Sequence, residues 1–319
     1  MIVSASRRTD IPAFYSEWFM NRIREQQACV VNPRNENQIS RISLTPSDVD
    51  CIVFWTKNAT PLENYLDELS ANYMYYFQYT LTAYDKDIEP HVPNKEKVII
   101  PNMIRLSEKL GSKRIIWRYD PIMLTSKYTR QKHCEIFEKY ASLLSGKIEK
   151  VIISFVDFTR QFNRNMKDID VITDSKYLDK EYTSLMFDFI AIAQKYNFEL
   201  ETCAEISNFT DNQFVKHTCC IDPKLIAEII PNFNDKLPKK DVGQKLRKAC
   251  GCCESNDVGA ANSCLHGCKY CYATLSHEEA ILNYKNLHQP SSNLLKGNLE
   301  MHPNAKITDR KIKHFITQK

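Results

Sequence analysis

Short apolar runs rich in β-branched and aromatic residues alternate along the chain with longer stretches that carry apolar residues at helical spacing. This alternation predicts β-strands, each followed by a crossover helix. The strands are expected at 1–6, 50–56, 75–82, 114–120, 150–157 and 198–205, and the helices at 13–27, 61–73, 93–111, 126–146 and 180–197. Strands joined by crossover helices are typical of a parallel sheet. Six of them favour a closed or nearly closed barrel over an open sheet, so we predict an α/β, TIM-barrel-like fold.

The regular alternation ends at residue 205. Downstream the sequence predicts a short helix at 222–230, a lysine-rich linker at 234–248, a cysteine-rich region and an amphipathic helix at 276–288. We therefore expect three parts. They are β/α barrel repeats over 1–205, a cysteine-rich segment over 206–290 that completes the barrel, and a polar C-terminal tail over 291–319.

Composition places the chain among ordinary globular proteins. Of its 319 residues, 43% are hydrophobic and 26% are charged, so disorder is not expected. A formal net charge of +4 is too mild to indicate a nucleic-acid-binding surface, although it does not exclude one. The N-terminus lacks the apolar region of a secretory signal, and no apolar run approaches the ~18 residues of a membrane span. We expect a cytoplasmic protein that does not bind membranes.

Polar and charged residues follow the predicted strands where each strand ends. In parallel α/β folds the ligand site forms at the carboxyl edge of the strands, whereas isolated polar residues there often only cap helices or form turns. Arginine side chains at such a site suit carboxylate or phosphate groups of a cofactor or substrate. The candidate catalytic residues are Arg8, Asp10, Lys57, Arg118 and Asp120, and the candidate cofactor-binding residues here are Arg7 and Asn58.

The most specific chemical signal is a cysteine loop near the C-terminal end. The chain has 12 cysteines, and in a cytosolic protein such thiols are kept reduced, so clustered ones indicate a metal or catalysis. Cys264, Cys268 and Cys271 form C-x-x-x-C-x-x-C, and thiolates select iron-sulfur clusters, zinc or copper(I). A closed zinc site needs a fourth ligand, which His266 could supply. Three thiolates around a 4Fe-4S cluster, with one iron left open, fit the spacing without a further ligand.

The segment CLHGCKYC resembles the cluster-binding motif of radical S-adenosylmethionine enzymes, C-x-x-x-C-x-aromatic-C, with Tyr270 at the aromatic position. The resemblance implies a 4Fe-4S cluster whose open iron chelates S-adenosylmethionine, and Tyr270 as a cofactor-binding residue. One electron from the cluster would then cleave the sulfonium to a 5'-deoxyadenosyl radical. An electron donor such as ferredoxin or flavodoxin would be the partner, beside an unknown substrate.

The chain departs from that superfamily in the position of the motif. The superfamily carries it after the first barrel strand, whereas here it lies close to residue 270, and no Gly-Gly-Glu segment is present. A circularly permuted order reconciles the position. In that order residues 253–261 form the strand before the cluster loop and residues 277–288 form the helix after it.

A second resemblance covers nearly the whole chain. The segments SASRRTDIPAFY, FWTKN, TLTAYDKDIEPHVP, WRYDPI, CAE, CID, CGC and CLHGCKYCYA occur in this order. They resemble the bacterial domain-of-unknown-function family 1848, whose cysteine-rich C-terminus is itself similar to the radical S-adenosylmethionine cluster site. The resemblance implies the fold and a cluster, but no substrate.

The other cysteines fall into two sets. Cys203, Cys220, Cys250 and Cys252 coincide with the family segments, and four thiols suffice for a second iron-sulfur cluster or a structural zinc site. The alternative is that some are ordinary buried cysteines, which behave as small apolar side chains. We interpret Cys29, Cys51 and Cys134 in that way, because they lie within strand or helix patterns.

We thus predict an iron-sulfur protein, with radical S-adenosylmethionine chemistry as the favoured activity. One alternative is a non-catalytic protein whose iron-sulfur or zinc centre only fixes the C-terminal segment over the barrel. Another is a lyase-like enzyme that acts on nucleic acid, because frequent aromatic residues beside basic ones could stack on bases.

Overall fold

The structure is a computed structural model that describes residues 1–203, 215–230, 241 and 250–312. Its main sheet has eight parallel strands in the order β10-β1-β4-β5-β6-β7-β8-β9. All six strands predicted from the sequence are confirmed. The strands are β1 (Ile2–Ala5), β4 (Cys51–Thr56), β5 (Tyr75–Thr80), β6 (Ile115–Ile122), β7 (Lys150–Phe155), β8 (Glu199–Cys203), β9 (Val215–Thr218) and β10 (Asn256–Asp257).

The last strand of this sheet along the chain lies beside the first. β10 pairs in parallel with β1, with Val3 opposite Asn256 and Ser4 opposite Asp257. From β1 onward the strands follow one another across the sheet in chain order. β10 lies within the segment predicted to form a strand before the cysteine loop, and α10 (His277–Leu287) follows that loop as predicted. The spatial order of strands is therefore a permutation of the chain order.

Helices cover one face of the sheet. Apolar side chains at alternate strand positions, such as Phe54, Phe77 and Trp117, pack into one buried cluster with the helices. The helices are α1 (Ile11–Phe14), α2 (Ser16–Arg24), α3 (Thr60–Glu63), α4 (Leu66–Ser70), the π-helix η1 (Lys95–Ile99) leading into α5 (Ile100–Leu110), α6 (Arg130–Leu144), α7 (Arg160–Asn165) and α8 (Ser175–Lys195). Apart from α7, which was not predicted, these helices overlap the predicted segments, and the segments 13–27 and 61–73 are each divided into two helices.

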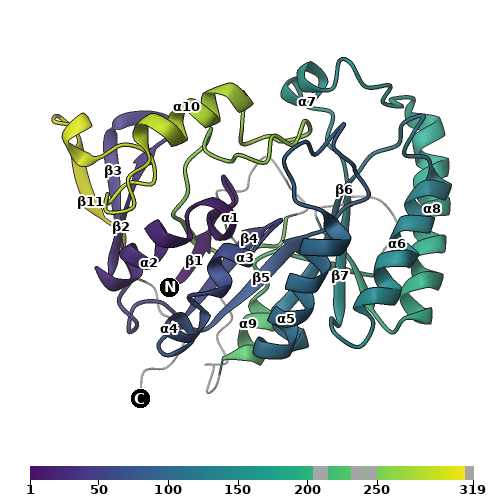
Figure 1. Cartoon of the computed structure of the whole chain (residues 1–319), viewed down its shortest axis with the longest axis horizontal. Helices are drawn as coiled ribbons and strands as arrows, with labels where there is room; N and C mark the ends of the chain where they lie inside the picture. The colour runs from purple at the N-terminus through teal and green to yellow at the C-terminus, as the bar shows by residue number, and fades with distance from the viewer. Residues whose placement is uncertain (204–214, 231–240, 242–249, 313–319) are drawn as a thin grey trace.

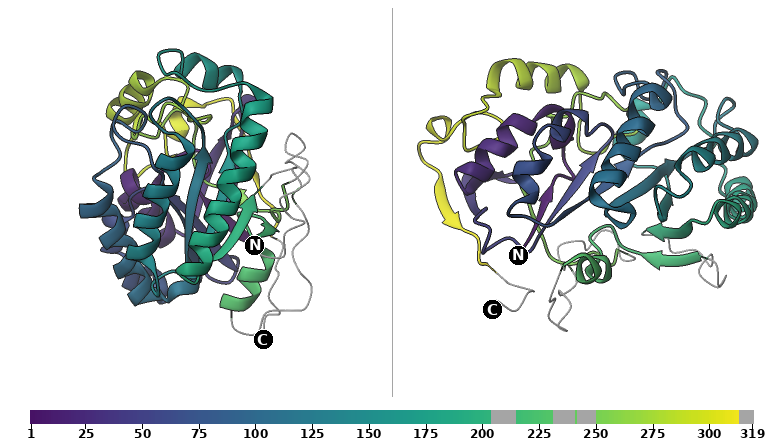
Figure 2. Two further views of the ribbon diagram at one scale, coloured as in Figure 1. Left: turned by 90° about the vertical axis from the view of Figure 1, so that its right-hand side faces the viewer. Right: turned by 60° about the horizontal axis from the view of Figure 1, so that its bottom comes forward.

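The cysteine-rich segment covers the other face. Val53, Tyr76 and Ile116 point to this face and pack in a cluster that contains seven cysteines and residues of α9 (Pro223–Ile229). Tyr76 Oη and Gln78 Nε2 from β5 both donate to the backbone oxygen of Cys220, at 2.9 and 2.7 Å. The right-hand view of Figure 2 shows α9, in green, below the strands and away from the blue helices.

The sequence favoured a closed or nearly closed barrel, partial or in permuted order, and the structure shows that the barrel does not close. Among the described residues β9 and β10 are the two edges of the sheet, and they do not pair with each other. Instead, residues beyond β9 meet residues before β10, where Cys253 N donates to Ile221 O at 3.1 Å. The described residues of the cysteine-rich segment cover the face opposite the helices and lie between the two edge strands. The result is an open, partial α/β barrel.

A small second sheet, which the sequence patterns did not predict, packs at one end of the molecule (Figure 1). It joins the antiparallel strands β2 (Gln27–Asn32) and β3 (Asn35–Ser43), and β11 (Lys306–Asp309) adds in parallel to β3. The sheet brings the C-terminal region beside an N-terminal hairpin. It also forms a wall of the cavity described below.

Parts of the predicted organisation lie outside the described residues. They are the boundary between residues 205 and 206 and nearly all of the lysine-rich linker at 234–248. Within the part of the chain that the structure describes, every helix is too short or too polar to cross a bilayer.

Candidate functional site

A cavity of ≈ 1450 Å³ lies at the carboxyl ends of the main-sheet strands. The cysteine loop and the hairpin of β2 and β3 form its other walls. Asn58 is not among the described residues that line it, because its side-chain oxygen accepts a hydrogen bond from Thr60 N. The cavity brings together all the other predicted site residues, namely Arg7, Arg8, Asp10, Lys57, Arg118, Asp120, Tyr270, Cys264, Cys268, Cys271, Cys203, Cys220, Cys250 and Cys252.

The loop that carries Cys264, Cys268 and Cys271 follows β10 and is held by backbone contacts. Lys269 N donates to Ile88 O at 3.0 Å, and His266 O accepts from His91 N at 3.2 Å. Gly267 has φ +66°, and a Cβ atom there would lie 3.0 Å from the His91 ring, so glycine suits this position. All three cysteines are half-buried and line the cavity.

Asp10 anchors the loop to the end of β1. Its carboxylate accepts hydrogen bonds from Thr56 Oγ1 at 2.8 Å, from Lys57 N at 2.7 Å and from Ala13 N at 3.0 Å. It also accepts one from His266 Nε2 at 2.8 Å. Four donors occupy this buried carboxylate, so the geometry gives Asp10 a positioning role. His266, considered above as a metal ligand, is held by Asp10 through one ring nitrogen.

Glu89 is a second anchor, and the sequence patterns did not single it out. This carboxylate is only 1% exposed, and it lies 2.7 Å from Lys57 Nζ and 2.8 Å from Lys95 Nζ. It also accepts hydrogen bonds from Thr82 Oγ1 at 2.8 Å and from Tyr270 Oη. Glu89 thus joins the aromatic residue of the cysteine loop to the ends of β4 and β5. The only sequence signal for it was its place in a segment that resembles the family.

The ionisation of this network follows from burial and charge. Burial alone would raise the pKa of Glu89, but the ammonium groups of Lys57 and Lys95 outweigh burial and lower that pKa well below its usual range. Burial, together with the Glu89 charge, raises the pKa of Tyr270 well above its ordinary value. Tyr270 therefore stays protonated and donates to a carboxylate. Burial raises the pKa of Cys268 to about 12, so this thiol is protonated until a metal cation replaces the proton.

Arg118 and Asp120 occupy the opposite wall. Arg118 pairs with Asp120, and Asp120 also accepts a hydrogen bond from Ser154. Arg118 Nη1 donates to Cys220 Sγ at 2.9 Å, and its guanidinium lies 5.5 Å from the centre of the Trp55 ring. By contrast, the guanidinium of Arg8 has no hydrogen-bond or ion-pair partner among the described residues. Of the candidate residues, Arg8 is therefore the cation best placed to receive an anionic group in the cavity.

Cys203, Cys220, Cys252 and Cys250 form a row of thiols in that order. Cys203 Sγ lies 3.1 Å from Cys220 Sγ. Cys252 lies close enough to Cys220 on one side and to Cys250 on the other for their side chains to shift one another's pKa. We call these four side chains the cysteine row. Cys29, Cys51 and Cys134 do not line the cavity, and the first two are buried.

The thiols are close together but are not arranged around a common point. As the side chains lie, no group of three or more His, Cys, Asp and Glu residues in the described ranges is positioned to hold a metal ion. The thiols therefore provide suitable metal ligands, but their side chains are not arranged in a coordination geometry.

Asp257, on β10, ties the start of the loop to β1 and was also missed. It accepts hydrogen bonds from Ser4 Oγ at 2.9 Å, Ser6 Oγ at 2.7 Å, Arg7 N at 2.8 Å and Gly259 N at 3.0 Å. A single carboxylate in a two-residue strand thus satisfies the ends of both strands. No residue pattern marked it, because its partners are distant in the sequence.

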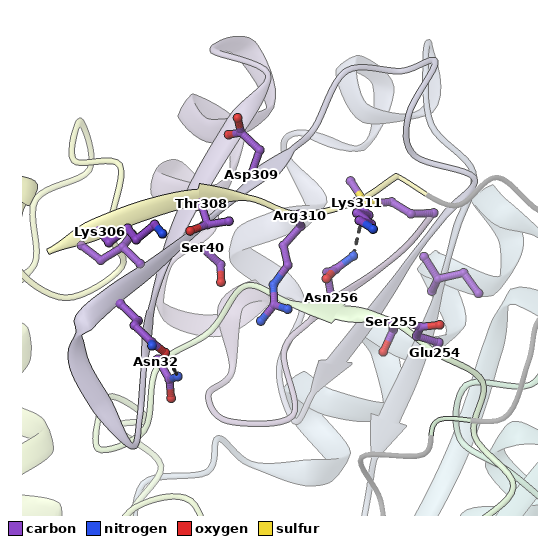
Figure 3. A pocket seen from close by; sticks show the side chains of 14 residues that line it. Asn32, Ser40, Glu254, Ser255, Asn256, Lys306, Thr308, Asp309, Arg310 and Lys311 are labelled. Atoms are coloured by element: carbon purple, nitrogen blue, oxygen red, sulfur yellow. Dashed lines mark hydrogen bonds between the residues drawn. The ribbon is translucent and has the colours of Figure 1, made fainter.

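A smaller cavity of ≈ 680 Å³ adjoins the first. Asn32, Ser40, Asn256 and Arg310 line both cavities. Figure 3 shows Arg310 extending from the end of β11 toward the gap between Asn32 and Asn256. The two cavities are therefore neighbours along the edge of β10.

These features define an α/β protein with an open parallel sheet and a cysteine-lined cavity at the carboxyl edge of its strands. The chain belongs to the family described as Domain of unknown function (DUF1848), whose model matches residues 2–273. The match extends from β1 through the cysteine loop and confirms the family expected from the sequence. No curated protein and no solved structure matches the chain.

Proposed function

We propose that the protein is an iron-sulfur enzyme that holds a 4Fe-4S cluster through Cys264, Cys268 and Cys271 and uses it with S-adenosylmethionine. The observation that carries the proposal is the position of these thiols. They lie on one loop, at the carboxyl edge of a parallel sheet, and face a cavity of ≈ 1450 Å³. Ligand sites of parallel α/β folds form at this edge.

The donor set fits the cluster. Thiolates are the ligands of iron-sulfur clusters, and this loop brings three to one wall of the cavity. Three thiols hold three irons of such a cluster and leave one iron open to a ligand. Asp10 holds His266 Nε2, and His266 Nδ1 is buried without a hydrogen-bond partner. When bound, a reduced cluster with an open iron would supply one electron to S-adenosylmethionine.

The chain's own residues would bind and orient the reactants. Arg8, whose guanidinium has no described partner, would bind a carboxylate or phosphate group by charge-assisted hydrogen bonds. Glu89, Lys57 and Tyr270 would fix the loop so that the thiols keep their orientation toward the cavity. The half-buried position of the thiols would limit access of water to the cluster.

The test is anaerobic reconstitution with iron and sulfide, followed by dithionite and S-adenosylmethionine. We expect iron and sulfide to bind and 5'-deoxyadenosine to form. Cys268→Ala should abolish the product. Cys134→Ala is the matched control, because this half-buried thiol lies on α6 outside the cavity, and it should leave the yield unchanged.

Two results would reject the proposal. The first is an absence of 5'-deoxyadenosine above background, together with no binding of S-adenosylmethionine to the reconstituted protein. The second is zinc without sulfide in place of iron at the loop, which would instead support a metal that only fixes the C-terminal segment.

A further inference from the structure

The cysteine row forms where three separate parts of the chain meet. Cys203 ends β8, Cys220 follows β9, and Cys250 and Cys252 precede β10. These segments belong to opposite edges of the main sheet, yet Cys203 Sγ lies 3.1 Å from Cys220 Sγ, and all four cysteines lie in one buried cluster. Four thiols rarely gather in this way by apolar packing alone, since any small apolar side chain would serve that purpose.

Backbone contacts hold this junction together. Ile221 N donates to Cys252 Sγ at 3.4 Å, and Cys253 N donates to Ile221 O at 3.1 Å. The oxygen of Cys220 accepts two hydrogen bonds from β5. Backbone N–H groups directed at thiolate sulfur are typical second-sphere contacts of metal-bound cysteine. The segments are thus fixed independently of the thiols.

Two cations, one buried and one half-buried, lie beside the row. Arg118 donates to Cys220 Sγ at 2.9 Å and is 5% exposed. Arg7 lies within electrostatic range of Cys252 and Cys220, and its Nη2 is fixed by Ser255 Oγ at 3.0 Å. Four thiolates around a divalent cation carry a net charge of about −2. Two guanidinium groups oppose a charge of that size.

We infer that Cys203, Cys220, Cys250 and Cys252 form a second, four-thiolate metal centre, separate from the cysteine loop. Sulfur atoms around one tetrahedral zinc lie about 3.8 Å apart, given Zn–S bonds of about 2.3 Å. The contact of 3.1 Å between Cys203 and Cys220 is closer to that spacing than to the wider spacing of ligands around a cluster. As the side chains lie they do not surround a common point, so binding of a metal would require cysteine side chains to rotate to other staggered positions. The centre joins the two sheet edges that no strand pairing closes.

The test uses the variant C264A/C268A/C271A, in which the cysteine loop can bind no metal. The full chain is purified anaerobically, and its zinc, iron and sulfide are measured. We expect this variant to retain about one zinc ion per chain. Retention of about four irons with sulfide would also support the centre, in the form of a closed cluster.

Adding Cys220→Ala and Cys252→Ala to this background should remove the metal. Adding Cys51→Ala and Cys134→Ala is the matched control, because neither thiol lines the cavity, and the metal should remain. Cobalt(II) titration of the metal-free background gives a second readout. A four-thiolate centre produces intense visible bands of tetrahedral cobalt, and Cys250→Ala alone should weaken and shift them while the far-UV circular dichroism stays unchanged.

A loop variant that carries no metal and no cobalt bands would overturn the inference. Metal that persists after Cys220 and Cys252 are both replaced would overturn it too. Either result leaves the proposed function standing, because the three cysteines of the loop are replaced in every protein used in this test.

Discussion

The two cysteine groups of this protein differ in how the chain assembles them. The three thiols of the loop come from one short segment, and a network of buried polar groups around Asp10 and Glu89 fixes that segment to β1, β4 and β5. The four thiols of the row come from three segments, and their main contacts are with one another and with Arg118. The loop is positioned by protein groups, whereas we expect a metal ion to complete the row.

This difference in assembly favours a different role for each group of cysteines. A loop with three thiols, a neighbouring cation and a cavity leaves a coordination position open, which favours reactivity. A row with four thiols uses every position, which favours a structural role. Substitutions that loosen the anchors of the loop should therefore affect the loop metal and spare the row metal.

Glu89→Gln should have the largest effect of the anchor substitutions. It leaves the two buried ammonium groups of Lys57 and Lys95 without a carboxylate, and breaking such a pair costs about 3–5 kcal/mol. We expect urea unfolding to show a loss of that size and reconstitution to give less iron on the loop. Metal in the row should persist.

Glu68→Gln is the control for Glu89→Gln. Glu68 pairs with Arg24 where both side chains are 44% to 47% exposed, and such pairs contribute about 0–1 kcal/mol. If Glu68→Gln lowered stability as much as Glu89→Gln, the result would contradict the role assigned to burial. If Glu89→Gln removed metal equally from the loop and from the row, the result would contradict the role of Glu89 as an anchor of the loop.

Gly259→Ala should disturb the start of the loop. A Cβ atom at Gly259 would lie 2.0 Å from Ser6 Oγ and 2.5 Å from Ser6 Cβ, so β1 and β10 would have to move apart. We expect a cost of about 1–3 kcal/mol in unfolding free energy. In a Ser6→Gly background the clash is absent, so the cost should fall; an unchanged cost in the double-mutant cycle would show that the contact is not the cause.

Two tyrosines on either side of Cys271 give a further contrast. Tyr270 Oη donates to the buried Glu89 carboxylate, and Tyr270→Phe should cost about 1.5–3 kcal/mol. Tyr272 is 62% exposed and donates to Arg7 O, so Tyr272→Phe should change stability by about 0.5 kcal/mol or less. Equal effects of the two variants on thermal unfolding would contradict the network around Glu89.

Much of the main sheet followed from the sequence, because its strands are buried on both faces and appear as short continuous apolar runs. The permuted place of β10 was predicted from a resemblance and not from its two residues. Of the closed and partial barrels that the sequence left open, only the partial one is found, since strand count alone does not show that α9 and the cysteines cover the face opposite the helices. The small sheet was missed because most residues of β3 and all residues of β11 are exposed, so neither strand appears as a continuous apolar run in the sequence.

In the site, features that depend on neighbouring residues in the sequence were predicted, and features that depend on contacts between distant residues were not. The thiol spacing of the loop and the polar residues at strand ends were visible in the sequence, and the cavity brings all but Asn58 together. Glu89, Lys95 and Asp257 were missed, because their importance comes from partners on other elements. The order of contacts in the cysteine row depends on tertiary structure, and no spacing in the sequence specifies it.

Electron paramagnetic resonance of the dithionite-reduced, reconstituted protein tests most directly whether the loop holds a cluster with an open iron. Spectra are recorded before and after S-adenosylmethionine is added, for the wild type and for C264A/C268A/C271A. We predict a reduced 4Fe-4S signal in the wild type that changes on addition of S-adenosylmethionine, and no such change in the variant. A wild-type spectrum without that signal, or one that S-adenosylmethionine leaves unaltered, would contradict the proposal.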